Sequence, residues 1–139
     1  MSYVEKALEI ATKAHEGQYD KSGVPYIEHP KHVAEGVHGD IAKATAYLHD
    51  VIEDTDVTVD DLRREGIPEE VIEAVVVMTH GKHESYFDYI RRLRKCPIAR
   101  EVKIADLKHN SDTSRIKRPT PRDIARTAKY KRALRILNE

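Results

Sequence analysis

The 139-residue sequence has a single cysteine, Cys96, and no long run of apolar residues. One cysteine forms neither an internal disulfide nor a thiolate cage, so any bound metal ion must have nitrogen and oxygen ligands. No stretch approaches the ~18 consecutive apolar residues of a membrane-spanning helix, and residues 1–5 lack the basic and then apolar order of a signal peptide. We therefore expect an intracellular, cytoplasmic protein without a membrane partner.

Neither sign of charge is in excess, because Lys and Arg number 24 and Asp and Glu also number 24. The charged share of 35% exceeds the usual ~25%, and the 40% of apolar residues excludes a disordered chain. The charge is unevenly placed, since residues 108–139 hold 10 Lys and Arg against 3 Asp and Glu. A basic tail is compatible with nucleic acid, a phosphorylated small molecule or docking on the acidic remainder of the chain.

The order of apolar and capping residues predicts an all-α fold. Capping boxes begin helices at Ser2, Thr58 and Thr120, and apolar residues recur three and four positions apart through most of the chain. The valine run at 75–77 fits a helix as well, because the apolar spacing continues on both sides of it. We predict one helical bundle of seven or eight helices, with residues 1–139 as a single domain.

The basic tail also contains apolar residues at helical spacing, namely Ile124, Ala128, Leu134 and Leu137. They favour a helix that docks on the body with its cations facing water, so nucleic acid is not the expected partner. Residues 17–30, in contrast, contain two glycines and two prolines. These residues interrupt any periodicity and predict a long loop of the kind that often carries function.

The densest group of ionisable residues is His-Asp-Val-Ile-Glu-Asp at 49–54. On one continuous helix His49 would lie over Glu53, and Asp50 over Asp54. Apolar residues alternate with these groups, so part of the cluster should lie beside the core. A buried carboxylate and imidazole need a partner or a cation.

Two other segments offer further ligands. His29 precedes Pro30, which predicts an extended His29 just outside the start of a helix. Asp106 adjoins an apolar helix stripe, and Asn110 follows one turn later on the same face. His29 and Asp106 together with His49 and Asp50 make a set of two imidazoles and two carboxylates. This set suits Mn2+, Fe2+ or Zn2+ better than Ca2+.

This pattern resembles the H…HD…D signature of the HD phosphohydrolase superfamily. Four blocks resemble, more narrowly, the hydrolase domain of RelA/SpoT-type alarmone enzymes: AHEGQ at 14–18, SGVPYIEHP at 22–30, HDVIEDT at 49–55 and IADLKHN at 104–110. The resemblance implies an all-helical enzyme that binds Mn2+, or another divalent transition metal, and removes the 3′-pyrophosphate of guanosine tetra- or pentaphosphate, (p)ppGpp. Because 139 residues leave no room for a synthetase or regulatory domain, it implies a small stand-alone hydrolase with a nucleotide substrate and no predicted oligomeric state.

The resemblance also implies roles for individual residues. The metal ligands are His29, His49, Asp50 and Asp106, and the catalytic residues that orient or deprotonate water are Glu53 and Asp54. Substrate contacts are implied for Lys21, Ser22, Asn110 and Thr113, with Lys103, Lys108 and Arg115 as further candidates for phosphate contacts.

The sequence departs from the family pattern at Leu107 and Ser111, and most seriously at Asp20. Asp20 stands where the family usually has an arginine that packs on the guanine base, so a stacking cation is replaced by an anion. This difference keeps two alternatives open. The chain can be an HD hydrolase of another nucleotide, such as a nucleoside monophosphate or NADPH, or a catalytically silent nucleotide sensor.

Overall fold

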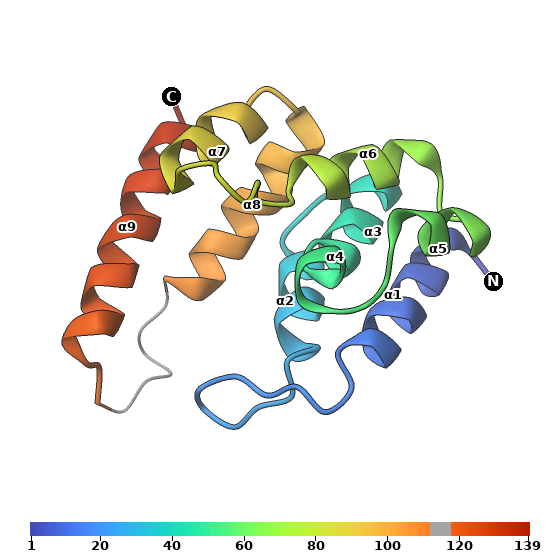
Figure 1. Cartoon of the computed structure of the whole chain (residues 1–139), viewed down its shortest axis with the longest axis horizontal. Coiled ribbons are helices and arrows are strands. Elements are labelled where there is room, and N and C mark those ends of the chain that lie inside the picture. The colour runs from blue at the N-terminus through green and yellow to red at the C-terminus, as the bar shows by residue number, and fades with distance from the viewer. Residues whose placement is uncertain (112–117) are drawn as a thin grey trace.

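The structure is a computed structural model that describes residues 1–111 and 118–139 (Figure 1). Regular secondary structure in these ranges is helical, apart from one isolated β-bridge between Tyr19 and Pro25. The helical segments of the described ranges are α1 (Tyr3–Ala14), α2 (Glu28–Glu35), α3 (Asp40–Leu48), α4 (Val51–Asp54), α5 (Val59–Arg64), α6 (Glu69–Val77), α7 (Tyr86–Leu93), α8 (Pro97–Asn110) and α9 (Pro121–Leu137). The all-helical prediction is confirmed.

Helix starts follow the capping residues. Ser2, Thr58 and Thr120 each accept a hydrogen bond from the backbone of the residue three positions later, and each capping box is complete. These caps satisfy backbone N–H groups that have no partner inside the helix. The valine run at 75–77 lies within α6, as predicted.

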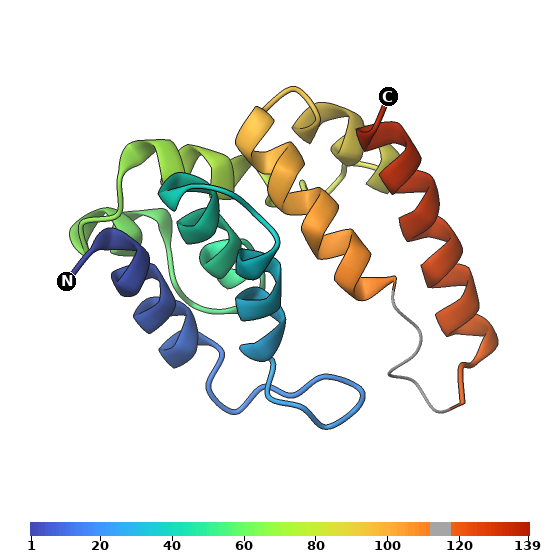
Figure 2. The same cartoon turned by 180° about the vertical axis from the view of Figure 1, so that it is seen from behind.

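The apolar core has two parts that share α3. Buried side chains of α2, α3, α7, α8 and α9 form one part, including Val33, Ile90 and Val102. Buried side chains of α1 and α3–α6 form the other, including Leu48 and Leu62. Burying one such side chain contributes roughly 1.5–3 kcal/mol. Figure 2 shows α2, α3 and α8 side by side, and each packs on the other two, so these three helices form a rigid frame.

The helix expected to run through residue 54 is divided. α3 ends at Leu48, and α4 begins at Val51 after a tightened turn in which the His49 N–H points to the Ala46 carbonyl. Val51 is fully buried, so the apolar pattern continues across the break and could not reveal it. The break turns Asp50 into the N-cap of α4 and leaves His49 and Asp50 at a junction rather than along one helix face.

His29 also differs from its predicted conformation. α2 begins at Glu28, so His29 lies in the first helical turn instead of in an extended segment before it. Proline is tolerated in this turn because the N–H that it lacks would have no helical partner there. Helix geometry therefore fixes the direction of the His29 side chain.

α9 docks through fewer residues than its apolar stripe predicts. Ala133, Ile136 and Leu137 are buried against the body, whereas Ile124 is 61% exposed and Ala128 is exposed. The C-terminal half of α9 therefore makes the contact, and Figure 1 shows it lying beside α7. No helix in the described ranges combines the length and hydropathy that a bilayer crossing needs.

Candidate metal centre

His29, His49 and Asp50 come together although they belong to different helical segments. One ligand atom from each side chain lies within 4.8 Å of the other two, a spacing that can hold a metal ion. Asp106 of α8 joins them, with its Oδ1 2.8 Å from His29 Nε2 and 3.5 Å from His49 Nε2. Both imidazoles and Asp106 are buried. The frame of α2, α3 and α8 thus brings together the four side chains that the sequence predicts as ligands.

The His49 ring has a defined tautomer. Its Nδ1 lies 2.6 Å from the carbonyl oxygen of Ala46, which only accepts hydrogen bonds, so Nδ1 carries the proton. In the neutral ring Nε2 then presents a lone pair. This buried nitrogen lies 3.0 Å from Asp50 Oδ2, yet no group in the described ranges is directed to hydrogen-bond with it. A lone pair that faces carboxylate oxygens is unfavourable, and a proton or a metal ion bound between them relieves the repulsion.

The charges of the cluster support the same conclusion. Burial lowers the pKa of His49, but the carboxylates of Asp50 and Asp106 outweigh burial and hold this pKa well above its ordinary value. Burial raises the pKa of Asp50, but the His49 charge outweighs it, and the net pKa is lowered. The cluster therefore binds positive charge strongly, whether the charge is a proton or a metal ion.

Tyr26 supports Asp50 from the loop before α2. Its hydroxyl donates a hydrogen bond to Asp50 Oδ2, and its ring packs against His15 and His29. Burial, followed by the charge of Asp50, raises the pKa of Tyr26. The sequence pattern predicts no role for Tyr26, although this residue stands three positions before His29 in the SGVPYIEHP block. This short distance in sequence from a predicted ligand was the feature that could have indicated a role for Tyr26 at the site.

The two oxygens of Asp106 have different partners. Oδ2 forms an ion pair with Lys103 Nζ at 2.9 Å, and Oδ1 faces the two imidazoles and accepts a hydrogen bond from Asn110 Nδ2 at 3.0 Å. Burial raises the pKa of Asp106, but Lys103 and then His49 hold it well below its usual range. Lys103 is thus engaged with a predicted ligand rather than available for a phosphate, whereas Lys108 is exposed.

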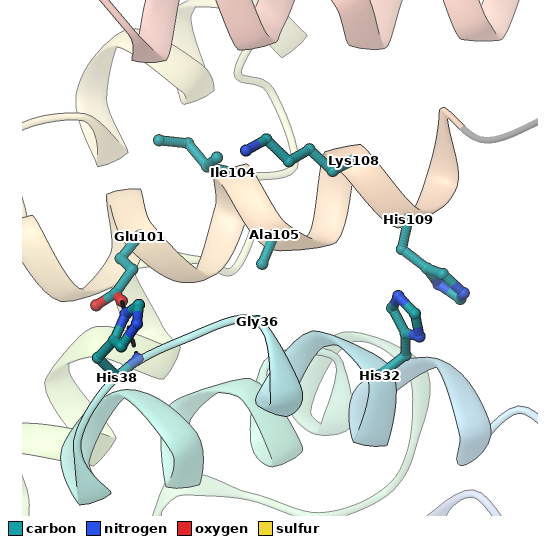
Figure 3. Close-up of a pocket in the computed structure, with 8 residues that line it drawn as sticks. All are labelled: His32, Gly36, His38, Glu101, Ile104, Ala105, Lys108 and His109. Carbon is teal, nitrogen blue, oxygen red and sulfur yellow. Dashed lines mark hydrogen bonds and ion pairs between the residues drawn. The ribbon is translucent and has the colours of Figure 1, made fainter.

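His109 braces His29 from the side away from the carboxylates. Its Nδ1 lies 2.6 Å from His29 Nδ1, and its ring stacks on those of His29 and His32. Figure 3 shows His109 of α8 pointing toward His32 of α2. A cavity of about 480 Å³ lies beside this stack, and Gly36 and Ala105 form part of its lining. The stack holds the ring of His29 in one orientation.

Glu53 and Asp54, the predicted catalytic pair, lie in α4 at the exposed margin of the cluster. Glu53 Oε1 accepts a hydrogen bond from the backbone N–H of His80. Burial, and then the neighbouring charges of Asp50 and Glu53, raise the pKa of Asp54. Two carboxylates therefore stand next to the candidate metal centre, and one of them has increased proton affinity.

The loop of residues 15–27 is shaped by Asp20. Its carboxylate accepts hydrogen bonds from the backbone N–H groups of Ser22 and Val24, at 2.8 and 3.0 Å. Lys21 reaches across to Asp123 at the start of α9, at 3.1 Å. Lys21 and Ser22 are exposed.

A cavity of about 390 Å³ lies beside this loop, and its lining includes Asp20, Val24, His29 and His109. The predicted substrate residues Lys21 and Ser22 thus lie on a folded loop beside the metal centre, whereas Thr113 and Arg115 fall outside the described residues.

A comparison with models of protein families shows which family the chain belongs to. The model of the HD domain matches residues 7–132 of this chain. The chain belongs to the HD domain family. This range contains every described residue of the candidate centre, and it begins and ends within the helical bundle.

Curated relatives of this HD domain chain include a guanosine-3′,5′-bis(diphosphate) 3′-pyrophosphohydrolase from Haemophilus influenzae, 36% identical over 127 residues and matching 81% of this chain. A GTP pyrophosphokinase from Streptomyces coelicolor is 32% identical over 124 residues, again 81% of this chain. The chain spans only 19% and 15% of the lengths of these two relatives.

The fold also occurs among solved structures. A metazoan ortholog of SpoT, which hydrolyzes ppGpp and plays a role in starvation responses, matches with a TM-score of 0.79 and 21% identity. The match covers 99% of this chain and 86% of the other. It establishes the likeness of the helical fold over nearly the whole chain.

The donor set fits a divalent metal ion. The two imidazole nitrogens are borderline ligands and the two carboxylate oxygens are hard ones, a mixed set that divalent first-row transition metals accept. The buried lone pair of His49 and the braced ring of His29 are directed ligands, since backbone and side-chain partners hold the other nitrogen of each ring. The His and Asp cluster can therefore hold a divalent metal ion.

Proposed function

We propose that residues 1–139 form a single metal-dependent phosphohydrolase domain that removes the 3′-pyrophosphate of guanosine tetra- or pentaphosphate. The reaction yields GDP or GTP and pyrophosphate. The observation that carries the proposal is the convergence of His29, His49, Asp50 and Asp106 from three separate segments on one point. Family membership and the printed activity of the Haemophilus relative support it.

The ion that we propose for this centre is Mn2+, with other divalent transition metals as competitors. When bound, such an ion lowers the pKa of a coordinated water toward ~7 and offsets charge on phosphoryl oxygens. His29 and His49 would hold it through their Nε2 atoms, because the Nδ1 atoms are occupied by His109 and Ala46. Asp106 would contribute Oδ1, because Oδ2 is paired with Lys103.

Proton transfer falls to the carboxylates of α4. Hydrolysis joins the water oxygen to the phosphorus nearest the ribose and leaves a hydroxyl on the 3′ carbon. One proton must therefore leave the water, and one must reach the 3′ oxygen. Glu53 and Asp54 stand at the margin of the cluster, and carboxylates at such a position serve as general base and general acid.

Substrate binding is assigned to the loop and the end of α8. Lys21 and Ser22 are exposed beside the cluster and can contact phosphates, with Lys21 exchanging Asp123 for the substrate. The cavity that Asp20, Val24 and His29 help to line is the expected place for the nucleoside. Asn110 and Thr113 complete the proposed set of nucleoside contacts. Asn110 has a second task, since its amide also orients Asp106.

A panel assay tests the proposed reaction. Purified protein with Mn2+ is given ppGpp, a nucleoside monophosphate and NADPH, and the release of phosphate and pyrophosphate is measured for each. The expected result is pyrophosphate release from ppGpp well above that from the other two. Turnover of another nucleotide with ppGpp left intact would reject the proposed substrate in favour of another HD hydrolase.

Asp20 bears on the alternative of a silent sensor. Its carboxylate has a structural task within the loop, where it holds the N–H groups of Ser22 and Val24. An anion at this position therefore does not by itself indicate lost catalysis. Saturable binding of ppGpp with no turnover in the same assay would nevertheless show that the chain is a nucleotide sensor, and it would exclude the proposed hydrolase activity.

A further inference from the structure

A group of arginines lies at the corner of the molecule where α7 meets the C-terminal half of α9. It surrounds a pocket of about 340 Å³, lined by Arg91, Arg94, Arg132, Arg135, Ile136 and Glu139. Figure 1 shows this corner at the opposite end of α9 from the loop that carries Lys21. The four guanidinium groups repel one another, and the single carboxylate of Glu139 offsets only part of this repulsion. A bound anion would offset the rest.

Part of this charge is used within the fold. Helix carboxyl ends attract cations, and Arg94 contacts the Ile136 carbonyl and the Glu139 carboxylate at 3.4 and 3.5 Å. Arg91 pairs with Asp88 at 3.3 Å. Arg91 and Arg94 are about half exposed in these pairs. Exposed ion pairs contribute little to stability. A ligand with more negative charge can therefore replace the carboxylates of Asp88 and Glu139 as the partner of these arginines.

The two arginines of α9 are not used in this way. Arg132 lies 4.2 Å from the centre of the Phe87 ring, which holds the guanidinium in place without neutralising it. Arg135 makes no hydrogen bond or ion pair in the part of the chain that the structure describes. The pocket therefore retains uncompensated guanidinium groups on one wall and weakly paired ones on the other.

The arrangement favours a compact ligand. Among the other cations of α9, Arg126 pairs with Asp123 and Lys129 lies over the ring of Tyr86, whereas Arg122 and Lys131 are exposed outside the pocket. The four arginines of the pocket surround one cavity instead of extending along a stripe, as the cations of nucleic-acid surfaces do. Each guanidinium can bind two phosphate oxygens in a fork. The pocket lining has no aromatic ring exposed for a base, because Arg132 covers Phe87.

We propose that this arginine pocket binds anions with two or three linked phosphate groups, free or at the end of a nucleotide, and recognises the phosphates rather than the base. The site is separate from the metal centre, and its existence does not depend on the proposed hydrolase activity.

Calorimetry with the full chain, freed of divalent metal by dialysis, tests the proposal. The probes are inorganic pyrophosphate, tripolyphosphate, GTP and ATP. The expected result is saturable binding of tripolyphosphate that weakens as salt increases, with GTP and ATP differing by less than about threefold. Arg135→Gln should weaken binding about tenfold or more, as expected for the loss of a charged hydrogen-bonding group. Arg122→Gln removes the same charge from the exposed first turn of α9, outside the pocket, and should leave the affinity unchanged.

Three outcomes would overturn the proposal. Equal binding by the Arg135→Gln and Arg122→Gln variants would move any binding elsewhere on the chain. Absence of saturable binding by every probe would remove the site. Tighter binding of single-stranded RNA than of tripolyphosphate at the same salt concentration, lost in Arg135→Gln, would replace the small ligand by nucleic acid. Unchanged hydrolysis by Arg135→Gln is expected in every case, which separates this test from that of the metal centre.

Discussion

Glu53 differs from the predicted ligands because its side chain is exposed and, among the described residues, hydrogen-bonds only to the backbone N–H of His80. Glu53→Gln keeps an oxygen that accepts this hydrogen bond, so fold and metal content should be preserved. Loss of a proton-transfer group should lower turnover by ~10²–10⁴. Pyrophosphate release and metal content are measured together, with Glu73→Gln on the exposed side of α6 as control. Undiminished turnover in Glu53→Gln would exclude the role.

Lys103 shows how a residue outside the predicted ligand set can support it. Its ammonium group pairs with Asp106 and lies 5.3 Å from the centre of the Tyr89 ring. Lys103→Met should destabilise the metal-free protein by about 3 kcal/mol at pH 7, because the buried Asp106 charge loses its partner. Urea unfolding measures the difference, and Lys108→Met, exposed on the same helix, should have an effect within about 0.5 kcal/mol.

The pH dependence of this effect has a definite sign. The folded-state pKa of Asp106 is held below its unfolded value, so its ionised form contributes stability above the unfolded pKa of ~3.9. That stability is lost as the pH falls through the folded pKa. The gap in unfolding free energy between wild type and Lys103→Met should therefore narrow in acid. A gap that stays constant from pH 7 to the acid limit of folding would show that Lys103 acts by packing alone.

At the scale of single elements, the helices with capping boxes could be predicted because cap and first turn are adjacent in the sequence. Ser2, Thr58 and Thr120 illustrate this. The break at His49 and Asp50 could not be predicted, since apolar periodicity reports which face is buried and not whether the backbone is continuous. The ligand set was nevertheless predicted, because a block of residues keeps its chemistry when its helix is interrupted. Tyr26 depends on a tertiary contact that the sequence does not encode locally, whereas Lys103 and Asp106 lie three positions apart on α8, a spacing that could have indicated their ion pair.

The loop before α2 offers a test of a structural role for Asp20. Gly23 has a φ of +80°, which favours glycine, and Asp20 holds the turn through two backbone N–H groups. Asp20→Ala removes both hydrogen bonds, whereas Asp20→Asn keeps an acceptor oxygen at the same place. Trypsin cleavage after Lys21 should be about fivefold faster in Asp20→Ala than in Asp20→Asn, as expected for a loss of ~1 kcal/mol in loop order. Equal cleavage rates would show that the carboxylate does not organise the loop.

At the scale of the whole molecule, one bound ion would connect α2 and α8 to the end of α3, the helix that the two parts of the core share. Binding to the folded chain alone stabilises it by about 2.7 kcal/mol when free metal exceeds its Kd a hundredfold. Mn2+ should therefore raise the Tm of the wild type by several degrees. His49→Ala, which removes a central ligand, should show no such rise in the same scan. A rise of equal size in both proteins would place the binding site outside this cluster.

The uneven distribution of charge along the sequence is also explained at the scale of the whole molecule. The basic tail docks through Ala133, Ile136 and Leu137 and directs arginines into the pocket with α7. The sequence could indicate the docked helix and its excess of cations. It could not indicate that Arg91 and Arg94, which lie 41 residues before Arg132 and Arg135, would line the same pocket, because their proximity follows from helix packing.

The convergence of His29, His49, Asp50 and Asp106 on one cation is tested most directly by a crystal grown with Mn2+ and measured for anomalous scattering. We expect one strong peak, bounded by the Nε2 atoms of both histidines and by carboxylate oxygens of both aspartates. A peak bound by other residues, or the absence of any peak at this position in a crystal containing Mn2+, would contradict it.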